Sequence, residues 1–112
     1  MIDKERVLRF IEKFHNKGER AQVIECFTCG QCYWFAAILI ARFREEAKCL
    51  LVYDEIENHF AAKIDDEIYD ITGVVTRQYN WIAWDDLVKN DKSLARRIHR
   101  DCILLEDIDI NE

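Results

Sequence analysis

An uninterrupted apolar run, CYWFAAILIA at residues 32–41, constrains the fold of this chain more than any other segment. Gly30 and Gln31 precede the run, and a charged stretch from Arg42 to Glu46 follows it. A helix that is apolar on nearly all sides has to be covered on most of them. We therefore expect a central helix over about residues 32–46, with Cys32 at its start and the rest of the chain packed around it.

The segments on either side of this run predict a helix before it and strands after it. Residues 3–17 carry apolar side chains at helical spacing, with charged side chains between them. Short strands are expected where apolar runs are bounded by charged or turn residues; these are residues 49–53, 58–64 and 67–71. Asp65 and Asp66 are expected to form the tight turn of a hairpin between the second and third strands.

The last third of the chain predicts shorter elements. Thr72-Gly73 is expected to close the third strand, and residues 78–84 suit a further strand or an irregular aromatic segment. A helix is expected to start at about Trp84, and Ser93 to cap a last helix that runs to about Cys102. Helices first and adjacent strands next predict an α+β fold, with the central helix packed on a small antiparallel sheet.

The length and net charge of the chain indicate a single domain and disfavour proteins that bind nucleic acids or membranes. The chain has 112 residues, which suits one domain, and a net charge of −6, which disfavours nucleic acid and anionic membrane surfaces as partners. No apolar stretch approaches the roughly 20 residues of a membrane span, and the charged N-terminus does not suit a signal peptide. We expect a cytoplasmic protein without a cofactor, whose five cysteines are free thiols, metal ligands or a nucleophile.

Cys32, His59 and Asp70 form the candidate catalytic set. The unpaired backbone N–H groups at a helix start stabilise a thiolate, which is the nucleophilic form of cysteine. A two-residue turn at Asp65-Asp66 places Ala61 opposite Asp70, so that His59 and Asp70 are diagonal neighbours on one face of the hairpin. Cysteine, histidine and carboxylate then supply a nucleophile, a base and a group that orients the base.

The sequence also resembles a known superfamily over roughly residues 28 to 75. GQCYWF at residues 30–35, NHF at 58–60 and IYDITG at 68–73 resemble segments of papain-like cysteine hydrolases, above all transglutaminase-like and NlpC-type domains and small phage-associated proteins. The resemblance implies a single papain-like domain over residues 1–112, with Cys32 as nucleophile, His59 as general base and Asp70 as the orienting residue.

The same resemblance implies an activity and a substrate class. Members of the superfamily hydrolyse peptide or amide bonds or transfer acyl groups, so the expected partner is a peptide, protein or amide substrate. Because Gln31 directly precedes Cys32, the backbone N–H of Cys32 is a better oxyanion donor than the Gln31 side chain. Independently of the resemblance, the aromatic residues Trp34, Tyr79, Trp81 and Trp84 are expected to pack in the core and at its rim, and Trp81 or Trp84 is an alternative candidate for lining a cleft beside Cys32.

Several alternatives stay open. The same fold suits a non-catalytic binding module of phage or mobile-element origin with a host protein partner. Cys26, Cys29, Cys32 and Cys49 are spaced for zinc or an iron–sulfur cluster, and the first two suit a reversible disulfide. Asp54 and Asn58 are weaker candidates than Asp70 for the polar partner of His59. The other histidines lie among charged residues and are expected to face solvent; these are His15 and His99.

Overall fold

The computed structural model describes residues 2–16, 32–76 and 78–100. Within these ranges four helices and a five-stranded antiparallel sheet make an α+β fold, as the sequence predicts. The elements are α1 (Lys4–His15), α3 (Cys32–Phe43), β1 (Cys49–Asp54), β2 (His59–Ile64), β3 (Glu67–Asp70), β4 (Gly73–Val74), β5 (Ile82–Ala83), α4 (Trp84–Asn90) and α5 (Lys92–Ile98).

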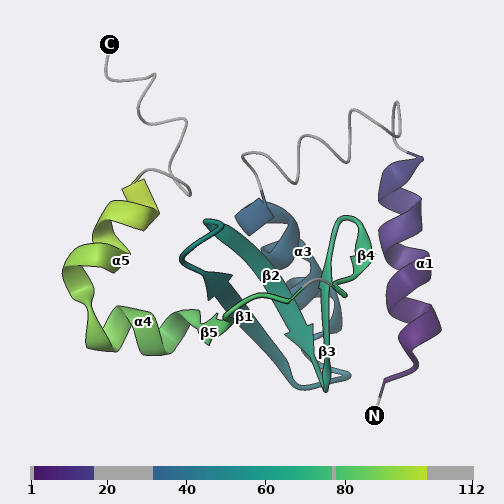
Figure 1. Ribbon diagram of the computed structural model, residues 1–112. Coiled ribbons are helices and arrows are strands. Elements are labelled where there is room, and N and C mark those ends of the chain that lie inside the picture. The colour runs from purple at the N-terminus through teal and green to yellow at the C-terminus, as the bar shows by residue number, and fades with distance from the viewer. Residues whose placement is uncertain (1, 17–31, 77, 101–112) are drawn as a thin grey trace.

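The sheet has the strand order β4-β3-β2-β1-β5, which puts β2 at its centre. In Figure 1, α3 lies behind the sheet, α1 stands on the right beyond β4, and α4 and α5 lie on the left beyond β5. The strand that carries His59 is therefore the central one, and the helix that begins with Cys32 packs on it.

The apolar run forms the central helix that the sequence predicts. Phe35, Ala36, Leu39 and Phe43 of α3 are almost completely buried. They join one hydrophobic cluster with side chains from α1, β2, β3 and the turn after β3; the other buried members are Val7, Ile11, Ala62, Ile64, Tyr69 and Ile71. Burial of large apolar side chains is the main favourable term in folding, so this cluster fixes α3 against the sheet.

A second hydrophobic cluster lies around the start of α3. Its buried members come from β1, β2, α4 and α5, and Cys32, Tyr33 and Trp84 pack against it; these members are Tyr53, Phe60, Leu87 and Ile98. Aromatic rings dominate the cluster, with Phe60 in edge contact with both Tyr33 and Trp84. Cys32 and Tyr33 at the start of α3 are thus held by a second cluster, in addition to the one that buries Phe35 and Phe43.

The hairpin of β2 and β3 has the predicted register. Ile64 pairs with Glu67 and Lys63 with Ile68, across a turn in which Asp65 has a φ of 54°. A positive φ in a two-residue turn matches the right-handed twist of the two strands. The local turn chemistry therefore sets which residues of β2 and β3 are neighbours.

Several element boundaries differ from the prediction. The central helix ends at Phe43, and residues 44–46 form a turn. Residues 78–84 contain only the short strand β5 before α4 begins. The carboxylate of Asp91 caps α5 by accepting from the Leu94 N–H, so Ser93 is inside the helix. Carboxylate and hydroxyl groups are similarly good caps, and the sequence alone did not separate them.

Gly73 does not close the third strand as predicted but begins β4, which pairs back onto β3. Its φ of +112° is a backbone conformation that favours glycine, and it allows the chain to reverse directly after Thr72.

No helix in the described part of the chain is both long enough and apolar enough to cross a membrane.

Candidate functional site

Cys32 meets the central strand at the start of α3. It is the first residue of that helix and is half-buried. Its sulfur accepts a hydrogen bond from the backbone N–H of Phe60, with 3.4 Å between Phe60 N and Cys32 Sγ. The side chain of His59, the residue before Phe60, also forms a hydrogen bond with Cys32. The structure thus brings the predicted nucleophile and the predicted base together.

His59 and Asp70 form the predicted diagonal pair. The distance from His59 Nε2 to Asp70 Oδ2 is 2.9 Å, and both side chains are only 10% exposed. Since Nε2 is bonded to the carboxylate, Nδ1 is the ring nitrogen that remains for the sulfur of Cys32. One imidazole therefore bridges the thiol and the carboxylate.

The Asp70 carboxylate is held from its other side by Thr72. Oδ1 accepts the Thr72 backbone N–H at 2.8 Å and also the Thr72 hydroxyl. Burial alone would raise the pKa of Asp70, but the hydrogen bonds from His59 and Thr72 outweigh it and lower the pKa below its usual value. Asp70 is therefore a fixed anion that orients the imidazole.

The charge state of His59 follows from the same contacts. Burial disfavours the charged imidazolium, but the hydrogen bonds and charges of Asp70 and Cys32 outweigh it and raise the pKa of His59 to about 9. At neutral pH the ring consequently carries both protons. The imidazolium is positioned between the carboxylate and the sulfur, which suits an ion pair at either side.

Two aromatic side chains flank His59. The ring of Tyr79 stacks on the imidazole with the centroids 5.6 Å apart, and the ring of Trp81 lies 6.0 Å away. Trp84 instead packs on Tyr53 and Phe60 in the second cluster. Trp84 therefore has the packing role, and Trp81, the other candidate for a cleft beside Cys32, lies beside the His59 ring.

A cavity of about 380 Å³ opens on the His59–Asp70 side of the site. Its volume is in the range of small-molecule sites. The described residues that line it do not include Cys32, so the cavity adjoins the imidazole and carboxylate rather than the sulfur. The lining residues are Glu57, His59, Asp70, Thr72, Val74, Val75, Thr76 and Tyr79.

Asp54, a weaker candidate partner of His59, has a structural role instead. Its Oδ1 accepts the backbone N–H groups of Ile56 and Glu57, and its Oδ2 accepts that of Asn80. Asn58, the other weaker candidate, accepts the Tyr53 hydroxyl. Asp54 thus ties the loop before β2 to the segment that carries Tyr79.

The structure excludes a metal site that uses Cys32 and Cys49 together. Cys32 Sγ contacts Phe60, which lies opposite Tyr53, whereas Cys49 lies opposite Ile64. Four residues of strand separate Tyr53 from Cys49, which is about 13 Å, while thiolates on one zinc ion lie within about 4 Å. No three His, Cys, Asp or Glu side chains of the described ranges are placed to hold a metal.

Cys26, Cys29, Cys102 and Gln31 lie outside the described residues, so the alternatives for Cys26 and Cys29, which include a reversible disulfide, stay open. His99 is exposed as expected, but the expectation for His15 is wrong. His15 is 6% exposed, and its Nε2 bonds to the carbonyl oxygen of Ile71 at 2.7 Å. This contact ties the end of α1 to the residue after Asp70.

The burial of His15 had a signal in the sequence that its polar neighbours concealed. It lies four residues after Ile11 and eight after Val7, on the apolar stripe of α1. Its Nδ1 is buried without a hydrogen-bond partner among the described residues. Helical spacing, more than the charges beside it, decided where this side chain lies.

Comparison with known proteins places the chain in a family. The family model for the Phage YunG-like protein matches residues 7–101, a range that contains Cys32, His59 and Asp70. The chain belongs to the Phage YunG-like family. No curated protein and no solved structure matches the chain. Membership of a phage family agrees with the phage-associated part of the sequence resemblance and carries no evidence for its papain-like or NlpC-type part.

Proposed function

We propose that this member of the Phage YunG-like family is a cysteine-dependent hydrolase or acyltransferase that acts on an amide or peptide bond. The supporting observation is the single imidazole that hydrogen-bonds both Cys32 and Asp70 at the start of the central helix. In this proposal Cys32 is the nucleophile, His59 the proton carrier and Asp70 the residue that orients His59.

The chemistry would begin from an imidazolium and a thiolate. Because the pKa of His59 is raised to about 9, the ring holds its proton at neutral pH, and its positive charge favours the anionic sulfur. Cys32 Sγ attacks the carbonyl carbon, the oxygen takes the negative charge, and the C–N bond then breaks. His59 gives its proton to the leaving amine, so that a thioester and a neutral imidazole remain.

The second half of the cycle reverses the proton transfer. Neutral His59 accepts a proton from water or from an acceptor amine, which attacks the thioester carbonyl and releases the thiolate of Cys32. Water gives hydrolysis and an amine gives acyl transfer. The backbone N–H of Cys32, which has no partner within the helix at this position, is the candidate donor to the oxyanion.

Acylation of the thiol tests this proposal directly. The protein is incubated with a p-nitrophenyl acyl ester, and the acylated residue is located by mass spectrometry. We expect a hydroxylamine-sensitive thioester on Cys32, its absence in Cys32→Ala, and its full retention in the matched control Cys49→Ala. Equal acylation of Cys32 and Cys49, or acylation elsewhere that persists in Cys32→Ala, contradicts the proposal.

A binding module without turnover is the second candidate. Membership of a phage family favours it, and so does the cavity, which adjoins His59 and Asp70 but is not lined by Cys32. In this alternative the protein occupies a site on a host protein, and the buried His59–Asp70 pair stabilises the fold. A binding module shows no preferential acylation of Cys32, so the same experiment separates the two candidates.

A further inference from the structure

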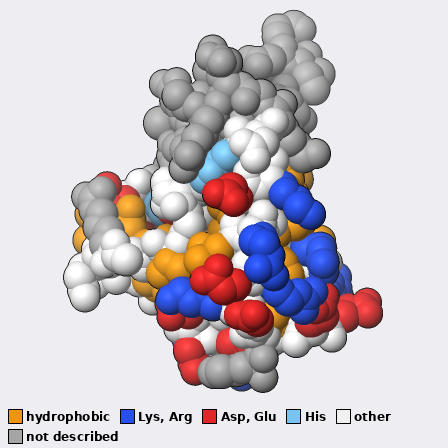
Figure 2. Space-filling view, turned by 90° about the vertical axis from the view of Figure 1, so that its right-hand side faces the viewer, with side chains coloured by type: hydrophobic (Ala, Val, Ile, Leu, Met, Phe, Trp, Pro, Cys, Tyr) orange, Lys and Arg blue, Asp and Glu red, His pale blue; other side chains and the backbone are white. Residues whose placement is uncertain are grey.

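A groove lined by cationic side chains lies between α1 and α3, away from Cys32. It has a volume of about 330 Å³ and is lined by Arg6, Arg9, Phe10, Lys13, Arg42 and Phe43. Figure 2 shows Lys and Arg side chains gathered on the face of the molecule toward which α1 lies. Cys32 and Phe43 are at opposite ends of α3, eleven residues or about 16 Å apart, so this groove is separate from the candidate active site.

The sequence of α1 puts its cations on one face. Residues 6, 9, 10 and 13 fall within about 100° of one another around a helix of 3.6 residues per turn. The α1 contribution to the groove is therefore a row of Arg6, Arg9 and Lys13 beside the ring of Phe10. Glu5 and Glu12 fall outside this sector, which leaves the row uniformly cationic.

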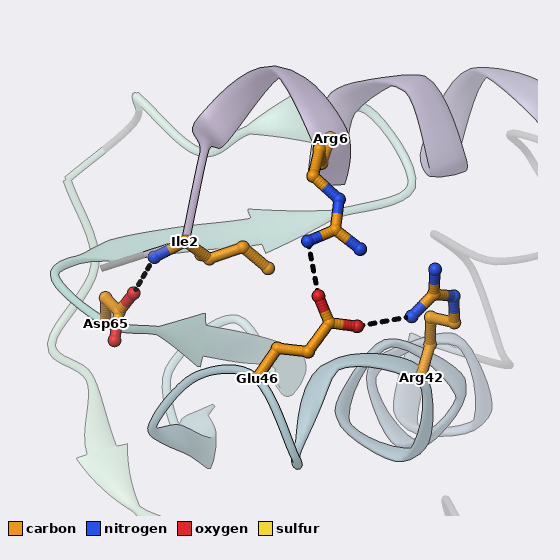
Figure 3. A network of polar contacts seen from close by, with 5 residues as sticks. All are labelled: Ile2, Arg6, Arg42, Glu46 and Asp65. Carbon is orange, nitrogen blue, oxygen red and sulfur yellow. Dashed lines mark hydrogen bonds and ion pairs between the residues drawn. The ribbon is translucent and has the colours of Figure 1, made fainter.

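Two of the guanidinium groups are held in place across the groove. Arg6 of α1 and Arg42 of α3 both bind the carboxylate of Glu46, as Figure 3 shows, with 2.9 Å between Arg42 Nη1 and Glu46 Oε2. The Arg42 guanidinium also lies over the Phe43 ring, 4.8 Å from its centroid, and 6.0 Å from that of Phe10. Such contacts pre-organise the cations at little further entropic cost when a ligand binds.

The groove keeps an excess of positive charge after this pairing. Four cations surround it, and Glu46 is the carboxylate that Arg6 and Arg42 share. Arg9 and Lys13 form no ion pair with any residue in the described ranges. The chain as a whole has a net charge of −6. The groove, in contrast, is positively charged, because Arg9 and Lys13 lie beside the rings of Phe10 and Phe43.

We propose that this groove binds an acidic peptide segment of a partner protein. Arg9 and Lys13 pair with its carboxylates, and Phe10 contacts an apolar side chain between them. Arg9 and Lys13 are four residues apart on α1, about 6 Å along its axis, and their side chains are long and flexible. They therefore reach carboxylates about 7 to 10 Å apart, which is the spacing of positions i and i+2 or i and i+3 in an extended peptide.

A peptide fits these features better than a nucleic acid does. Binding to DNA rests on neutralising several phosphates along a broad basic face. This groove is short, Glu5 and Glu12 border its cationic row, and the chain as a whole is acidic. The partner is consequently expected to supply two carboxylates and one apolar side chain, and its binding is independent of the proposed activity of Cys32.

Fluorescence anisotropy with the full chain tests the proposal. The probe is the fluorescein-labelled peptide GEAFEG, with GQAFQG as the neutral peptide and a thymidine hexanucleotide as the nucleic acid. Arg9→Glu/Lys13→Glu reverses the two unpaired cations, and Lys89→Glu/Lys92→Glu on α4 and α5 makes the same change in charge elsewhere. Circular dichroism establishes that each variant is folded, and Arg9→Gln/Lys13→Gln replaces the reversal if it is not.

We expect GEAFEG to bind the native chain and the α4–α5 control alike, and at least tenfold more weakly after reversal of Arg9 and Lys13. Binding should weaken with added salt, since it rests on exposed charges. Three results overturn the proposal: equal binding of GQAFQG, unchanged binding by the groove variant, or no saturable binding up to about 1 mM peptide. Tighter binding of the hexanucleotide that is lost in the groove variant assigns the groove to nucleic acid instead.

Discussion

Cys32 and Cys49 are both half-buried thiols, but the groups around the two sulfur atoms differ in kind. Cys32 accepts the Phe60 N–H and hydrogen-bonds an imidazole whose raised pKa keeps it charged at neutral pH. Cys49 instead donates toward the Ala47 carbonyl oxygen at 3.7 Å. Burial and the charge of Asp65 raise the pKa of Cys49. The proposed reactivity of Cys32 rests on this difference in surroundings, because donors and cations favour a thiolate while acceptors and carboxylates disfavour it.

The largest expected difference between the two cysteines is their rate of alkylation. At pH 6 an ordinary thiol is only about 0.3% thiolate. The proposed nucleophilic role of Cys32 therefore predicts that iodoacetamide modifies Cys32 on the order of 100-fold faster than Cys49. Peptide mapping after timed quenching measures both rates in one sample. His59→Gln is the matched variant, and it should remove most of the preference. Equal alkylation rates for the two cysteines in the native chain would contradict the proposed activation of Cys32.

The stability of the protein should also depend on the protonation of His59. Its pKa is about 9 in the folded chain against 6.5 for a free imidazole, so the stabilisation is complete below pH 6.5 and is lost as the pH rises through 9. The expected loss is about 3 kcal/mol, at about 1.4 kcal/mol per pKa unit. Urea unfolding between pH 6 and pH 10 measures it.

His59→Gln and Asp70→Asn are the controls for this pH dependence. Each should flatten the decline in the free energy of unfolding above pH 6.5, and in Asp70→Asn the titration of His59 followed by NMR should shift to lower pH. The lowered pKa of Asp70 affects stability at acidic pH instead. The stabilisation from the Asp70 carboxylate is lost as the pH falls through the pKa of Asp70 in the folded chain. A native chain with the same slope as His59→Gln contradicts the charged pair.

A smaller effect is expected from the hydroxyl group that supports Asp70. Thr72→Val removes the side-chain donor to Oδ1 and keeps the backbone donor and the shape of the residue. We expect a loss of about 1 kcal/mol in the free energy of unfolding, the usual contribution of one hydrogen bond, and a modest decrease in the pKa of His59. An unchanged His59 titration would show that the backbone N–H alone fixes the carboxylate.

The smallest effect is expected at Cys49. Cys49→Ala removes a half-buried thiol that packs at the edge of the first cluster, so the free energy of unfolding should fall by less than about 1 kcal/mol. The alkylation rate of Cys32 should not change, because the two sulfurs lie at different ends of the β1–β2 pairing. A slower Cys32 in this variant would indicate that the two sites are coupled.

Short-range patterns predicted much of the site. The apolar run at residues 32–41 indicated the buried helix α3, and the turn at Asp65-Asp66 indicated the register that makes His59 and Asp70 diagonal neighbours. Both inferences depend on periodicity and turn chemistry within a few residues, where the geometry is nearly the same in every protein. The catalytic roles of these residues stay a proposal.

Long-range packing decided what the sequence did not predict. His15 lies 56 residues from the carbonyl of Ile71, and β4 forms only because the chain reverses at Gly73 and pairs back onto β3. The separation of Cys49 from Cys32, which excludes a shared metal site, likewise follows from the β1–β2 pairing and not from spacing along the chain. None of these contacts has a local signature.

By itself the sequence determined a buried helix that begins at Cys32, an α+β arrangement and a hairpin that joins His59 to Asp70, because each follows from local spacing. Only the tertiary structure brought the sulfur to the backbone N–H of Phe60 and beside the His59 ring, and put Arg42 against the cationic row of α1. These contacts join segments that lie far apart in the chain, and their geometry is set by how α1, α3 and the sheet pack together.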